Sequence, residues 1–194
     1  AGGARCLGSS HPLCALLDPF AAGGDPEVVA RPLRGALFAV AGDERAQRVA
    51  TSFALACGGN PVVVGEERRD AYHAAAAMVA NDLVALLASA EVLCEQAGLP
   101  RNAARAGLLH LADSSVRALQ VAATPEGRSW ADGLTGAVGR GDADTLKGHL
   151  VALAGQPDAR GAHVRLSRIL LDLVADRLAP KEASNVRAAL KIDD

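Results

Sequence analysis

The sequence predicts a mostly α-helical protein that begins with a short α/β segment. Apolar residues make up 50% of the 194 residues and are mainly alanine, leucine and valine, while aromatic residues make up only 3%. Alanine and leucine are strong helix formers, so this composition favours helices. Two apolar runs, 36–41 and 61–65, instead have the length and continuous hydrophobicity of strands that are buried on both faces.

The first 65 residues are predicted to form the edge of a larger α/β sheet. A small apolar piece at 4–7 precedes the segment 8–13, which we interpret as a strand end entering a loop. Between the two apolar runs, Asp43 is a natural N-cap for a helix that the glycines at 58–59 would end. We expect a parallel β-α-β unit, which needs further strands because two or three do not make a stable parallel sheet.

From Glu66 onward the pattern of apolar residues is helical to the end of the chain. Helices are predicted at 68–97, at 101–123, from the pair Thr124-Pro125, from the cap Asp142 to near 155, at 162–178 and at 181–190, with a glycine-rich loop at 133–141. The first of these is apolar around most of its circumference, so we expect a central, buried helix. Its most apolar part carries Asn81 and Asp82 and is short for a bilayer, which argues against a membrane span.

Charge and cysteine usage exclude several classes of function. The net charge is −2 and the arginines are scattered, whereas a nucleic-acid partner would require a basic patch. The cysteines at positions 6, 14, 57 and 94 form no CxxC pair, and no His or Cys pair has compact metal-ligand spacing. We therefore expect no metal, and we interpret the cysteines as small buried side chains in a reducing cytoplasm.

Three motifs, taken together and in order, resemble one protein family. They are the segment 8–13 with sequence GSSHPL, the Tyr72-His73 pair followed by alanines and Asn81, and the loop 134–142 with Thr145 and His149 beyond it. The chain resembles a family of bacterial NAD(P)-dependent oxidoreductases with a Rossmann-like first half and a helical C-terminal domain. That family is similar in plan to 6-phosphogluconate dehydrogenase, ketopantoate reductase and pyrroline-5-carboxylate reductase.

The resemblance implies a division of the chain into 1–65, the remnant β-α-β edge of a Rossmann-like domain, and 66–194, a helical domain like the C-terminal domain of 6-phosphogluconate dehydrogenase. No G-x-G-x-x-G follows a strand and opens a helix in these residues. NADP or NAD would therefore be held mainly by a segment absent from this chain. Without that segment, this chain would not be active alone. Arg69 and Ala137 stand where the family has lysine and proline, and arginine cannot readily give up a proton.

The candidate catalytic residues are His73 and Tyr72, at the start of the long apolar helix. A histidine can donate or take the proton that a carbonyl reduction requires at neutral pH, although either side chain could instead bond nearby backbone. The resemblance implies that Asn81 helps bind substrate or nicotinamide. A structural amide with internal partners is the alternative.

The candidate substrate-binding residues in the glycine-rich loop are Thr135, Arg140 and Asp142. Arg140 could clamp a carboxylate or phosphate, so we expect a small substrate with an anionic group. Alternatively, Asp142 is only a helix cap and Arg140 its ion-pair partner. His11 is a further candidate because open α/β sheets bind ligands at the carboxyl ends of strands. We hypothesise that His73 and Arg140 face one cleft.

The sequence thus predicts the substrate-binding and dimerisation part of an NAD(P)-dependent oxidoreductase whose substrate is unknown. A homodimer is expected because the long apolar helix has few other helices to cover it and the sheet has an unpaired edge. The alternative is a non-catalytic module for ligand binding or dimerisation.

Overall fold

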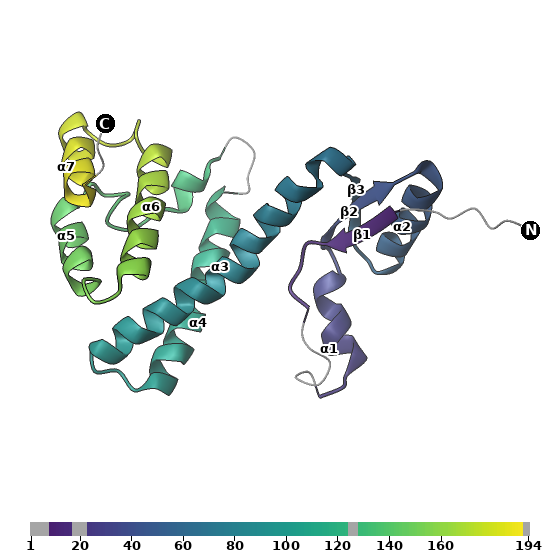
Figure 1. The fold of residues 1–194 in the computed structure, drawn as a ribbon, viewed down its shortest axis with the longest axis horizontal. Helices are drawn as coiled ribbons and strands as arrows, with labels where there is room; N and C mark the ends of the chain where they lie inside the picture. The colour runs from purple at the N-terminus through teal and green to yellow at the C-terminus, as the bar shows by residue number, and fades with distance from the viewer. Residues whose placement is uncertain (1–7, 17–22, 124–127, 192–194) are drawn as a thin grey trace, which may run out of the picture. The chain divides into compact units, whose positions relative to one another are not determined.

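The computed structural model describes residues 8–16, 23–123 and 128–191. The chain divides into two units, Ala1–Leu83 and Val84–Asp194, and the boundary falls within a long helix, α3. Three strands lie near the start and helices make up most of the rest (Figure 1), so the predicted mostly helical fold with a short α/β start is confirmed. The division into domains after residue 65 stays a prediction.

The first unit contains a three-stranded sheet in the order β1-β2-β3. β2 (Leu37–Gly42) and β3 (Asn60–Val63) are parallel, as predicted, and four consecutive residues of β2 are buried. β1 (Gly8–Pro12) pairs with β2 along its whole length in the antiparallel direction. The predicted strand end thus lies at Pro12, and more of the segment 8–13 is strand than expected, because pairing with a distant strand satisfies the backbone of these polar residues. The short helix α1 (Pro26–Ala30) and turn η1 (Arg31–Leu33) precede β2.

α2 (Glu44–Ala56) packs on the sheet, as Figure 1 shows. The Asp43 carboxylate caps this helix by accepting a 2.8 Å hydrogen bond from the amide of Ala46, as the sequence predicts. Ala46 lies so close to β1 that a Cβ at Gly8 would be 2.5 Å from the Ala46 Cβ. Val49 and Phe53, farther along the same helix, are exposed.

α3 (Arg69–Gln96) follows the turn η2 (Glu66–Arg68) and continues from the first unit into the second. None of its residues is buried, so the expectation of a central, buried helix was wrong. In the described part of the chain, Glu66–Gln96 is the one helix long and apolar enough to cross a membrane, judged by length and composition alone. The residues at its end are joined to α4 (Arg101–Ala123) by ion pairs of Glu91 with Arg101 and Arg105.

The second unit has its core where α5 (Ala143–Ala152), α6 (Pro157–Leu173) and α7 (Pro180–Leu190) pack together with the turn η3 (Trp130–Gly133) (Figure 1). Leu146, Leu171 and Val186 are fully buried there. α6 begins five residues before its predicted start, because Pro157 is tolerated in a first turn. The predicted helix start at Thr124-Pro125 lies outside the described residues.

Candidate functional site

Four predicted site residues line one cavity of about 680 Å³ in the first unit: His11, Tyr72, His73 and Asn81. His11 comes from β1, Tyr72 and His73 come from the start of α3, and Asn81 comes from near the middle of that helix. Alanines of α3 and the residues that follow β1, Cys14 among them, complete the lining. The fold therefore brings together residues that are up to seventy positions apart in the sequence.

The rings of His11, Tyr72 and His73 contact one another. The ring centroids of His11 and His73 are 4.4 Å apart, and that of Tyr72 is 5.7 Å from His11 and 5.9 Å from His73. The Tyr72 hydroxyl donates a 3.1 Å hydrogen bond to the backbone carbonyl of His11, which fixes the start of α3 against β1.

His11 lies in this cavity for a different structural reason from the one that the sequence suggested. Because β1 is antiparallel to β2, its carboxyl end at Pro12 lies opposite Phe38, near the amino end of β2. The rule that ligands bind at the carboxyl ends of parallel strands therefore does not place His11. Its contacts with Tyr72 and His73 do.

Three ionisable groups of the cavity lining, His11, Tyr72 and Cys14, are biased toward their neutral forms. Burial, together with the charges of His73 and Arg69, lowers the pKa of His11. Burial raises the pKa of Tyr72, although the backbone amide of Ala39 opposes this shift, and burial also raises the pKa of the Cys14 thiol. Nδ1 of His11 is buried with no hydrogen-bond partner among the described residues.

Replacement of Tyr72 by phenylalanine is expected to lower the free energy of unfolding by about 1 kcal/mol, since it removes one hydrogen bond and keeps the ring. Urea unfolding followed by circular dichroism measures this loss. If the midpoint and slope of the urea unfolding transition are unchanged, the hydrogen bond to the His11 carbonyl contributes nothing to stability.

Asn81 is exposed on α3 and lines the cavity. Within the described residues its side-chain amide makes no hydrogen bond, so the internal partners that a structural amide would need are not found there. Its amide is therefore available to a ligand, and its role stays a prediction.

The three loop candidates lie in the second unit and have local partners. Arg140 donates through Nη1 to the carbonyl of Thr135, and its Nη2 is 4.0 Å from the Asp142 carboxylate. Asp142 caps α5, accepting from the Thr145 amide at 3.0 Å and the Thr145 hydroxyl at 2.6 Å. The Thr145 hydroxyl and amide, followed by the charge of Arg140, lower the pKa of Asp142. The interactions of the structural alternative, in which Asp142 caps a helix and Arg140 pairs with it, are thus found in the structure.

His149, which also belongs to the motif, lies against His163, with ring centroids 5.4 Å apart.

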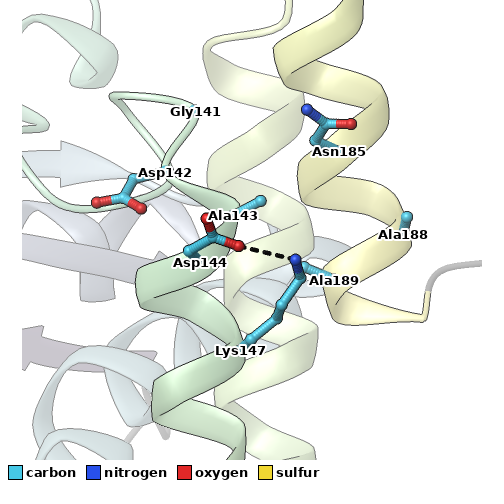
Figure 2. Close-up of a pocket in the computed structure, with 8 residues that line it drawn as sticks. All are labelled: Gly141, Asp142, Ala143, Asp144, Lys147, Asn185, Ala188 and Ala189. Atoms are coloured by element: carbon cyan, nitrogen blue, oxygen red, sulfur yellow. Dashed lines mark hydrogen bonds and ion pairs between the residues drawn. The ribbon is translucent and has the colours of Figure 1, made fainter.

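Thr135 and Asp142 line separate cavities. Asp142 lies beside a polar cavity of about 440 Å³ between α5 and α7, where Asp144 and Lys147 form a 2.8 Å ion pair and Asn185 lies across from them (Figure 2). Thr135 lines an apolar cavity of about 510 Å³ with Trp130 and Ser115. The structure does not gather the loop candidates into one site, and Asn185 gave no signal in the sequence.

Cys14 is the site residue that sequence reasoning missed. It is a free, half-buried thiol in the lining of the first cavity, whereas its distance from the other cysteines suggested only packing. Cys57 and Cys94 are also free and half-buried, and Cys6 lies outside the described residues. Across the described ranges, no three His, Cys, Asp or Glu side chains gather in a way that could hold a metal ion.

Comparisons with known proteins support the fold. The chain is similar to the crystal structure of protein TM1727 from Thermotoga maritima, with a TM-score of 0.66 and 20% identity over 88% of this chain and 62% of that one. It is also similar to the "putative NADP oxidoreductase BF3122" from Bacteroides fragilis, with a TM-score of 0.56 and 20% identity over 72% of this chain and 51% of that one. The chain thus spans less than two thirds of either structure's length. No curated protein matches it.

One family model covers most of the sequence. It matches residues 36–169 and is described as "Domain of unknown function (DUF2520)". The matched range includes β2, β3, the Tyr72-His73 pair, Asn81 and the whole glycine-rich loop. The chain belongs to the DUF2520 family.

Proposed function

We propose that this chain is the substrate-binding and dimerisation part of an NAD(P)-dependent oxidoreductase with the plan of 6-phosphogluconate dehydrogenase and its relatives. The observation that carries this proposal is the convergence of His11, Tyr72, His73 and Asn81 on one cavity. Titratable side chains in a mostly apolar cavity are the usual composition of an active site. The fold shared with a protein described as a putative NADP oxidoreductase supports the same class.

The described residues do not fit the diphosphate of NADP or NAD. A dinucleotide diphosphate binds at a helix N-terminus with free amides after a glycine-rich turn. The helix that follows β2 has its N-terminus capped by the Asp43 carboxylate, which would repel a phosphate. The proposal therefore assigns the cofactor mainly to a segment outside this chain, in keeping with the greater length of the similar structures.

The residues of this chain would act on the substrate. Reduction of a carbonyl adds a hydride to carbon and a proton to oxygen, and the hydride belongs to a reduced nicotinamide. His73, in its protonated form, would donate the proton to the substrate oxygen. The Asn81 amide would hydrogen-bond the same oxygen, while Tyr72 would hold His11 and His73 in place through its bond to β1.

Replacement of His73 by asparagine tests this function. In the natural polypeptide that carries this chain, NADPH-dependent reduction of carbonyl substrates should fall about 10²- to 10⁴-fold in kcat, with a smaller change in KM. His110→Asn is the matched control, because His110 is exposed on α4 in the second unit. Equal rates for the His73 variant and wild type would remove His73 from the chemistry. Absence of any NADPH oxidation with carbonyl compounds would contradict the oxidoreductase assignment.

Replacement of Asn81 by leucine is expected to leave the unfolding free energy within about 0.5 kcal/mol of wild type, because the amide is exposed and has no partner in the described chain. Ligand affinity should fall about tenfold, the cost of one lost hydrogen bond. Thermal melts and a binding titration measure the two effects. A stability loss of about 1–3 kcal/mol would instead identify a structural amide.

That His73 and Arg140 face one cleft stays a hypothesis from the sequence. The two residues lie in different units, and the local partners of Arg140 are Thr135 and Asp142. A non-catalytic dimerisation module is the second candidate function, and the exposed apolar surface of α3 favours it.

A further inference from the structure

The chemical character of the cavity around His73 limits what it can bind. Beyond His11, Tyr72, His73 and Asn81, the described residues that line it are Pro12, Leu13, Cys14, Ala15, Ala75, Ala76, Ala77, Val79, Ala80 and Leu83. No aspartate, glutamate, lysine or arginine is among them. Its volume of about 680 Å³ suits a small molecule.

Arg69 is the cation whose charge acts on His11, but it does not line this cavity. Arg69 lines a separate crevice with His11, Tyr72 and His73, and that crevice has a volume of only about 10 Å³. Its guanidinium is also 4.0 Å from the Glu66 carboxylate. Arg69 therefore acts on His11 through its charge, which helps keep His11 neutral, and is not in the lining of the larger cavity.

A buried carboxylate or phosphate needs a counter-ion or several hydrogen-bond donors, and without them it loses more in desolvation than it gains. Among its described lining residues, this cavity offers a carboxylate no lysine or arginine, and the one cation in the proposed reaction is the protonated His73, which loses its charge when it donates its proton. The cavity offers an apolar body the methyl groups of four alanines of α3, Ala75, Ala76, Ala77 and Ala80. An uncharged carbonyl oxygen needs only one or two donors, which His73 and Asn81 supply.

We infer that this cavity takes a neutral carbonyl compound with an apolar body, and that it discriminates against an anionic compound of the same shape. The inference rests on the proposed function only in treating the cavity as the substrate site. The sequence led us to expect a substrate with an anionic group. For this cavity, the inference replaces that expectation with a neutral substrate.

A matched pair of probes tests the inference. Benzylacetone and hydrocinnamate have the same phenylethyl body and differ in a methyl ketone against a carboxylate. The imidazole signals of the five histidines report binding by NMR, because His11 and His73 lie in the cavity while His110, His149 and His163 are internal controls in the second unit. Benzylacetone should shift the signals of His11 and His73 in a saturable manner, and hydrocinnamate should bind at least about tenfold more weakly.

A space-filling variant locates the binding. Ala77→Leu fills the cavity from α3 and should abolish the ketone-induced shifts, whereas Ala74→Leu, on the same helix but outside the lining, should leave them unchanged. Both changes exchange one strong helix former for another, so circular dichroism should show equal helix content. Shifts that persist in Ala77→Leu would overturn the inference, as would equal or tighter binding of hydrocinnamate or binding of neither probe.

The experiment separates this inference from the proposed function, because it uses neither cofactor nor turnover. Ketone binding without any NADPH-dependent reduction would refute the oxidoreductase assignment and leave the neutral-ligand inference standing. NADPH-dependent turnover together with preferred binding of hydrocinnamate would support the oxidoreductase assignment and refute the neutral-ligand inference.

Discussion

Replacing Val84 by glutamate is expected to convert a homodimer into monomers by raising the dimer Kd about 100-fold or more. Val84 is 66% exposed near the middle of α3, a helix of 28 residues with none buried. We propose that a second copy of the chain covers this long apolar surface in solution. A glutamate there would be buried without a counter-ion, and two-fold symmetry would place it in the interface twice. Sedimentation equilibrium measures the change.

Val49→Glu is the matched control. It is the same substitution at a similarly exposed position, 64%, on another helix, α2. It should leave the dimer intact. A wild-type protein that is monomeric at high micromolar concentration would contradict dimerisation. Stable partition of the wild type into lipid vesicles would contradict it as well, because the helix Glu66–Gln96 is long and apolar enough to cross a bilayer.

Replacing Phe38 by alanine is expected to lower the free energy of unfolding by about 3–5 kcal/mol. Phe38 is 0% exposed in β2, and its ring packs edge-on against Phe53 with centroids 6.4 Å apart. A Cβ at Gly59 would be 2.3 Å from the Phe38 ring, so the space around it is tightly filled. The first unit has a small core, and this loss is a large share of the roughly 5–15 kcal/mol that stabilise a typical domain.

Phe53→Ala provides the comparison, because Phe53 is 57% exposed and its loss should cost only about 1 kcal/mol. Urea unfolding gives both values, and amide exchange of β2 assigns the loss to the first unit. The Phe38 variant should also lose the close contact of His11 with His73, because β1 is held in register by β2. Equal effects of the two substitutions would show that Phe38 does not anchor this unit.

The elements that local sequence determines were predicted well. β2, α2 and β3 follow from two continuous apolar runs and the Asp43 cap, and the helix α4 matches its predicted bounds. The full length and antiparallel direction of β1 could not be predicted, since its polar residues are a strand only through pairing with β2, about thirty positions away. The apolarity of α3 indicates that the helix must be covered. It does not indicate that the covering surface belongs to the same chain.

The candidate site likewise has a part that the sequence predicts and a part that it does not. Tyr72 and His73 are neighbours in sequence, so either one predicts the position of the other. Their contact with His11 depends on the antiparallel direction of β1, which residue spacing does not encode. Cys14 enters the cavity for the same reason. The cap at Asp142 was predictable because Thr145 is only three residues away.

The turn η3 gives the molecule a built-in optical reporter. Trp130 is the only tryptophan of the chain and lies in the second unit, whereas Tyr72, the only tyrosine, lies in the first. Selective excitation of indole emission therefore follows the second unit alone. The phenol of Tyr72 follows the first unit in the same way, so one sample can report the unfolding of each unit separately.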